Sequence, residues 1–153
     1  MKRAALLIAL IVLVALPSGQ IDASPAEGCA TVLDQLSVRD PWVAEALPGQ
    51  SMTAAYMVVA NEGEVDEELL TVESEVAEKL ELHKMEQQGE MMRMRRVDSI
   101  VIGPGYEVAL EPGGLHIMLI GLTRELKAGD TVEMKLNFKS GANLTVSAPV
   151  KKR

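Results

Sequence analysis

The two histidines of the chain stand in the same tripeptide form, His83-Lys84-Met85 and His116-Ile117-Met118. Side chains two residues apart on a β-strand point to the same face of the sheet. Each tripeptide can therefore direct an imidazole nitrogen and a thioether sulfur at one point. Nitrogen and soft sulfur donors, without a carboxylate or a thiolate, suit Cu(I) better than zinc, calcium or magnesium. The repeated tripeptides predict a soft-metal site.

A third donor joins this set if the segments 79–85 and 91–97 pair as a β-hairpin. With residues 87–90 as the loop, paired positions add to 177, and His83 then lies opposite Met94. Directly opposed side chains on neighbouring strands have Cβ atoms about 5 Å apart, which is close enough to share one metal ion. The hairpin therefore predicts a second thioether beside His83.

Short strands are the elements that must position these side chains. From Leu36 onward, short apolar segments with alternating polar residues are separated by glycine, proline and asparagine, as turns between strands require. The segments 132–138 and 144–148 alternate clearly enough to predict a hairpin with one buried face. The other predicted strands are 36–43, 52–60, 68–72, 79–85, 91–97, 100–102, 106–110 and 115–120. This spacing predicts an all-β sandwich or barrel.

One stretch is open to two interpretations. Residues 74–88 are rich in Glu, Lys, Ala and Leu, so propensity alone allows a helix there. The choice affects the site, because residues two apart diverge by about 200° around a helix but share a face on a strand.

Composition excludes several classes of function. The chain has 153 residues, of which 48% are hydrophobic, and this fits one domain. The net charge of −7 repels phosphate and four aromatic residues offer few stacking surfaces, so we expect no nucleic-acid partner. Nine methionines stand against one cysteine, which cannot form an internal disulfide.

The N-terminal residues are typical of a secretory signal peptide. Residues 1–23 combine Lys2 and Arg3 with an apolar run that is shorter than the roughly 20 residues of a spanning helix. We therefore expect export, without stable membrane insertion, of a chain with a flexible leader at 24–35, a domain at 36–150 and a short basic tail at 151–153. A retained membrane anchor and lipid attachment at Cys29 are the alternatives.

The spacing of the candidate donors resembles the signature of the periplasmic copper chaperones called PCuAC. Ten residues separate His83 from Met94, twenty-one separate Met94 from His116, and Met118 follows after one more. The similarity extends over about residues 36–150. It includes the segments Asp40-Pro41-Trp42, Ala54-Ala55-Tyr56-Met57, Leu82-His83-Lys84-Met85, Pro112-Gly113-Gly114 and Leu126-Lys127-Ala128-Gly129-Asp130.

The resemblance implies a cupredoxin-like β-sandwich or Greek-key barrel that binds one Cu(I). Its ligands by position are His83, Met94, His116 and Met118, with Met85 near the site but not a core ligand. The implied function is non-enzymatic copper delivery for cuproenzyme assembly, particularly of the binuclear copper centre of cytochrome c oxidase. The implied location is the periplasm, and the implied partners are copper acceptors such as an oxidase subunit or a Sco-type protein.

Three other classes of function compete with copper delivery. A blue-copper electron carrier needs a cysteine thiolate, and Cys29 lies before the domain. An enzyme needs an open coordination position or a nucleophile with its base, and neither is found in the sequence. The remaining alternative is an exported binding or adhesion sandwich with no metal role, in which the methionines fill the core.

Overall fold

The computed structural model of the chain describes residues 35–152, and all of its regular secondary structure is β-strand. The predicted all-β fold class is therefore confirmed. No helix long and apolar enough to cross a membrane occurs among these residues. The predicted signal peptide, Cys29 and Arg153 lie outside the described residues. The strands are β1 (Leu36–Ala44), β2 (Met52–Asn61), β3 (Glu67–Glu73), β4 (Ala77–Gln88), β5 (Met91–Arg96), β6 (Ile100–Ile102), β7 (Glu107–Leu110), β8 (Leu115–Leu122), β9 (Thr131–Phe138) and β10 (Asn143–Lys151).

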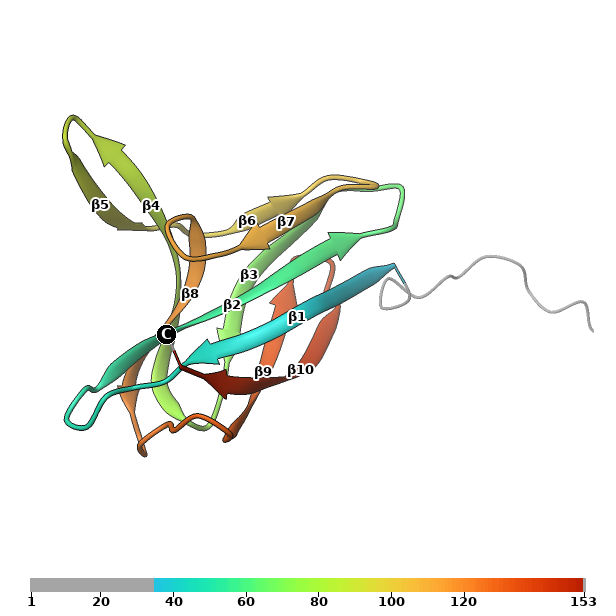
Figure 1. Cartoon of the computed structure of the whole chain (residues 1–153). Coiled ribbons are helices and arrows are strands. Elements are labelled where there is room, and N and C mark those ends of the chain that lie inside the picture. The colour runs from blue at the N-terminus through green and yellow to red at the C-terminus, as the bar shows by residue number, and fades with distance from the viewer. Residues whose placement is uncertain (1–34, 153) are drawn as a thin grey trace, which may run out of the picture.

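The ten strands are hydrogen-bonded in the order β5-β4-β8-β7-β2-β1-β10-β9-β3-β6. Strands β1 and β10 run parallel where they join the two halves of this order, with Val43 opposite Val150. The sheet folds back on itself, so that β9 and β10 lie across from β2 and β8 (Figure 1). One hydrophobic core fills the space between the two halves, as a sandwich requires.

Alternating side chains supply this core. On β9, Val132, Met134, Leu136 and Phe138 are buried while the residues between them are exposed or half-buried. Strand β10 pairs with β9 so that Leu136 faces Leu144, which confirms the hairpin predicted from the sequence. On the other half of the sandwich, the inward residues alternate in the same way with residues on an outer face. The candidate site lies on that outer face.

Residues 74–88 form the strand β4 from Ala77 onward and not a helix. The strand pairs with β8 from Ala77 to Lys84 and with β5 from His83 to Gln88. Hydrogen bonding along both edges and burial of Leu82 in the core outweigh the weak helical propensity of its Glu, Lys and Ala residues. Residues two apart on β4 therefore share a face, as the predicted site requires.

The predicted register of the β4–β5 hairpin is wrong by two residues. Met85 lies opposite Met94 and His83 lies opposite Arg96, so paired positions add to 179. The hairpin closes with a two-residue turn in which Gly89 has a φ of 64°. Glycine in the first position of such a turn is favoured because it accepts positive φ, and the tight turn shortens the expected four-residue loop. A slip of two residues leaves every side chain on its predicted face.

The distal part of this hairpin protrudes from the sandwich. Beyond Lys84, strand β4 has passed the end of β8 and pairs with β5. The result is a two-stranded arm that projects away from the other strands (Figure 1). All six residues of β5 are exposed.

Candidate metal centre

The two histidines meet on the outer face of neighbouring strands. Strands β4 and β8 are antiparallel, and His83 lies directly opposite His116. Their ring centroids are 5.9 Å apart and the planes are tilted by 50°. On β8, Ile117 and Leu119 point into the core, so the alternation turns His116 and Met118 outward. The same alternation around Leu82 places His83 and Met85 on this outer face.

A cavity of about 460 Å³ opens beside His116. Three thioether side chains line it, those of Met85, Met94 and Met118, together with His116. Met85 and Met94 are direct cross-strand partners. The remaining lining residues are Trp42, Ala54, Tyr56, Pro112, Gly113 and Lys152. The cavity therefore presents sulfur and imidazole donors with few competing oxygens.

The imidazole of His116 is fixed by the turn that precedes it. Its Nδ1 lies 3.1 Å from the carbonyl oxygen of Gly114. A carbonyl can only accept, so Nδ1 carries the proton and Nε2 carries the lone pair. The same carbonyl accepts the backbone N–H of Met85 at 3.1 Å, which holds β4 against the turn. Gly113 has a φ of 86°, a conformation that permits this tight turn.

The imidazole of His83 is oriented by a carboxylate instead. Its Nε2 lies 2.9 Å from Oε2 of Glu81. Lys79 and His83 lower the pKa of Glu81 to about 2, so this carboxylate is ionised at neutral pH and accepts a hydrogen bond from the Nε2–H of His83. In the neutral ring, Nδ1 then carries the lone pair. His83 Nδ1 is buried without a hydrogen-bond partner.

Both carboxylate oxygens of Glu81 already have partners. Its Oε1 lies 2.5 Å from Nζ of Lys79 and 3.4 Å from Nη1 of Arg96, while Oε2 holds His83. These cations offset its charge, and an oxygen already shared with a cation is a poor metal ligand. The carboxylate therefore orients the imidazole, as carboxylates do behind many metal-bound histidines.

Aromatic rings close the other side of the cavity. Trp42 lies opposite Tyr56 on the neighbouring strand, with ring centroids 4.5 Å apart. The Tyr56 ring is in turn 6.4 Å from that of His116. A bulge between Arg39 and Trp42, with Asp40 at a φ of 49°, brings Trp42 onto the outer face. Apolar walls of this kind limit water access and favour neutral, soft donors.

The structure brings the four predicted site residues to one region. Met94, His116 and Met118 line the cavity. His83 is half-buried and is not among the lining residues, but it lies directly opposite His116 on the neighbouring strand. The arrangement adds Met85, which lies directly opposite Met94. The wrong hairpin register did not displace Met94, because it stays diagonal to His83 on the same face.

Sequence reasoning missed the residues that orient the donors. Glu81 carries the only local signal, since it stands two residues before His83 and so shares its face of β4. The role of the Gly114 carbonyl depends on the conformation of a turn. The Trp42–Tyr56 wall depends on pairing between β1 and β2 across a bulge. Neither of these contacts has a signal in residue spacing.

Other kinds of metal site are not found in the described part of the chain. Within residues 35–152 no group of three or more His, Cys, Asp and Glu side chains is placed to hold a metal ion. Oxygen-rich sites for calcium or magnesium and thiolate sites for zinc need such groups. The donors assembled on the outer face are therefore imidazole and thioether.

Comparison with known proteins identifies a family and a related protein. The family model "Putative lipoprotein LpqE-like" matches residues 36–150. A putative lipoprotein of Leifsonia xyli subsp. xyli is 35% identical over 119 residues, which span 77% of this chain and 70% of the relative.

Two solved structures have the same fold and are named for copper. The copper-bound PCuAC domain from PmoF2 is 25% identical, with a TM-score of 0.67, over 78% of this chain and 94% of that domain. The solution structure of CuI-DR1885 from Deinococcus radiodurans is 33% identical, with a TM-score of 0.65, over 81% of this chain and 83% of that one. These matches confirm the resemblance noted from the spacing of the donors. The chain belongs to the LpqE-like family, and its domain is of the PCuAC type.

Proposed function

We propose that this protein is an exported copper metallochaperone that binds one Cu(I) ion and passes it to an acceptor protein. The proposed ligands are His83, Met94, His116 and Met118. The likeness to copper-bound PCuAC domains supports a role in copper handling. The ligand set is supported by the residues that gather on the outer face of β4, β5 and β8.

One observation carries the proposal. The buried Nδ1 of His83 has no hydrogen-bond partner, while the other nitrogen of the ring is held by Glu81. A buried polar atom without a partner costs roughly 1–3 kcal/mol, so a native fold keeps one where a ligand satisfies it. His116 complements it by bonding Nδ1 to Gly114 and leaving Nε2 for a ligand. A Cu(I) ion between the two rings would satisfy both lone pairs.

The chemistry of the donors also suits both binding of Cu(I) and its transfer to an acceptor. Imidazole and thioether are neutral and soft, which favours Cu(I), and a thioether binds without losing a proton. They also resist the disulfide formation that disables a thiol site outside the cytosol. An acceptor that offers thiolates binds Cu(I) more tightly, so transfer from this site to such an acceptor is downhill.

A competitive titration tests the proposal. The purified domain should take one equivalent of Cu(I) from the chelator bicinchoninate, and no stable second one. Trp42 is the only tryptophan and lines the cavity, so its fluorescence should change up to one equivalent and then stay constant. An exported adhesion module with no metal role would leave the chelator fully loaded and the fluorescence unchanged.

The carboxylate behind His83 should be measurable in the same titration. Replacing Glu81 by glutamine removes the charge that orients the imidazole, and loss of such a partner typically weakens metal binding 10- to 100-fold. We therefore expect Glu81→Gln to weaken Cu(I) binding by about tenfold or more. Glu86→Gln is the matched control, because Glu86 lies on the opposite face of β4 beside Arg95. Equal Cu(I) affinity of the two variants would show that Glu81 does not contribute to metal binding.

The acceptor proposed from the resemblance is a cytochrome c oxidase subunit or a Sco-type protein. A transfer assay would mix the Cu(I)-loaded chain with the exported domain of the oxidase subunit from the same organism. Copper transfer to the oxidase domain in the absence of a Sco-type protein supports direct delivery. Transfer that needs a Sco-type protein supports an intermediate, and no transfer to either would refute this part of the proposal.

Export is proposed from the signal-like residues 1–23 and supported by the relatives, which are named as putative lipoproteins. Those names also support the alternative of lipid attachment at Cys29. The mass of the protein recovered from cells distinguishes a chain cleaved after Ala23 from one that begins at an acylated Cys29. A mass that retains residues 1–23 would contradict both routes.

A further inference from the structure

The protruding β4–β5 arm carries methionines on the same face as the metal centre. His83, Met85 and Gln87 alternate along one face of β4, and Met94 and Met92 lie opposite Met85 and Gln87 on β5. The sulfur side chains therefore continue outward from the centre in the order Met94, Met92. Met94 is 47% exposed and Met92 is 54% exposed, so both are open to solvent.

These methionines have no structural role that accounts for their sulfur. Neither Met92 nor Met94 belongs to either hydrophobic cluster of the described residues. A two-stranded hairpin has no core of its own to fill. An exposed thioether on such an arm is a soft, neutral donor available to any Cu(I) ion near it.

We propose that Met92, with Met85 and Met94, forms an outer Cu(I) exchange position through which the ion enters and leaves the centre. This inference rests on the proposed copper function. Met85 and Met94 are direct cross-strand partners, so their Cβ atoms are about 5 Å apart. Met92 is two residues from Met94, about 7 Å along the strand, and its flexible side chain points to the same face.

The exchange step is a ligand substitution. Cu–S bonds to Met85 and Met92 form while the bonds to His83, His116 and Met118 break, and Met94 keeps its bond as the shared ligand. No proton moves, because a thioether is neutral before and after binding. No electron moves either, because copper stays Cu(I). The ion then lies on the exposed arm, where an acceptor can displace Met92.

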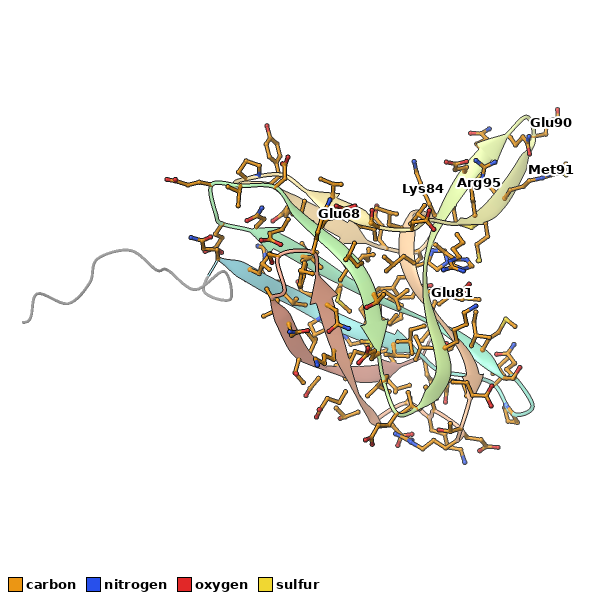
Figure 2. The ribbon with its side chains drawn as sticks, turned by 180° about the vertical axis from the view of Figure 1, so that it is seen from behind. Glu68, Glu81, Lys84, Glu90, Met91 and Arg95 are labelled. Atoms are coloured by element: carbon orange, nitrogen blue, oxygen red, sulfur yellow. The ribbon has the colours of Figure 1, made fainter. Side chains whose placement is uncertain are left out.

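The opposite face of the arm provides a matched control. Met91 pairs with Gln88 on the face that also carries Arg93 and Arg95, and its side chain is 60% exposed. Figure 2 shows Met91 and Glu90 at the tip of the arm. Met91 and Met92 are thus adjacent and similarly exposed, and they lie on opposite faces of the arm, with Met92 on the face shared with His83 and Met94.

The test compares Met92→Leu with Met91→Leu in the Cu(I)-loaded protein. Leucine keeps the size of the side chain and removes the sulfur. Two quantities are measured with the chelator bathocuproine disulfonate: the equilibrium Cu(I) affinity and the rate at which the chelator removes the ion. Met92→Leu should slow removal at least threefold with the affinity unchanged, and Met91→Leu should match the native protein in both.

A second readout follows the methyl groups directly. With ¹³C-labelled methionine methyl groups, a half-equivalent of Cu(I) should broaden the Met92 signal by exchange and leave the Met91 signal sharp. Equal removal rates for the two leucine variants would overturn the exchange position. An affinity loss in Met92→Leu as large as that in Met94→Leu would overturn it too, by making Met92 a resident ligand. Absence of Cu(I) binding to the native protein would instead refute the copper function itself.

Discussion

A His116→Ala variant should lose at least about 100-fold in Cu(I) affinity. Loss of a residue that only orients a ligand typically costs 10- to 100-fold, so loss of a ligand should cost at least the upper end of that range. His116 lines the cavity and is 4% exposed, and its Nδ1 is held by the Gly114 carbonyl, so Nε2 is the nitrogen left for a ligand. Competition with bicinchoninate measures the change, and circular dichroism confirms that the variant is folded.

The control for this variant lies on the same strand. Ile120 shares the outer face of β8 with His116 and Met118 but does not line the cavity. Ile120→Ala should therefore keep the native Cu(I) affinity. Native affinity in His116→Ala would exclude the imidazole from the site.

Replacing Met94 and Met118 together by leucine should have a still larger effect. Both thioethers disappear while the two imidazoles remain, so the site changes from soft to borderline donors. We expect Cu(I) affinity to fall by at least about 1,000-fold, since two of four ligands are lost. Ag(I), a redox-inert analogue of Cu(I), should lose affinity in parallel. Leucine is close to methionine in volume, so the free energy of unfolding should change by less than about 1.5 kcal/mol per site.

The chain offers a matched pair of buried methionines for comparison. Met57 is 2% exposed and Met134 is 0% exposed, and both belong to the core between the two halves of the sandwich. The double variant Met57→Leu, Met134→Leu should lower the free energy of unfolding and leave the Cu(I) affinity unchanged. Equal Cu(I) affinities for the two double variants would show that the thioethers of the outer face do not bind the ion.

The outer-face location makes these variants informative. The core side chains of β8 are Ile117 and Leu119, whereas the proposed ligands alternate with them on the other side of the strand. Ligands can therefore be replaced without opening a cavity in the core.

The strands could be predicted from the sequence, because a half-buried strand leaves an alternating pattern. This holds for β9 and β10, whose predicted hairpin is confirmed. It holds less well for β4, where Glu, Lys and Ala also suit a helix. Hydrogen bonds to β5 and β8 and burial of Leu82 in the core make this segment a strand. Strand β8 is distant in the sequence and the pairing with β5 depends on a turn, so the local sequence does not specify them.

The register of β4 and β5 could not be predicted, for a physical reason. Alternation determines which face a side chain occupies, and a slip of two residues preserves it. The register in which paired residue numbers add to 177 and the one in which they add to 179 place every side chain on the same face. The turn at Gly89 decides between the two registers. Face and register thus have different causes, which is why Met94 was assigned to the correct face but to the wrong partner.

Candidate donors could be selected from the sequence, but the orientation of their rings could not. The repeated tripeptides, the hairpin and the family spacing indicate His83, Met94, His116 and Met118 as candidates, and these remain proposed ligands. Which nitrogen of each imidazole is available depends on Glu81 for one ring and on the Gly114 carbonyl for the other. These contacts arise from side-chain rotation and a turn, so the sequence alone does not specify them.

The most direct test of the central claim is an X-ray absorption spectrum at the copper edge of the chain loaded with one equivalent of Cu(I). The proposed ligands predict a first shell of two imidazole nitrogens and two thioether sulfurs. The same measurement on the Met94→Leu, Met118→Leu double variant should lose the sulfur contribution. A native spectrum with only nitrogen and oxygen scatterers would contradict the His and Met site.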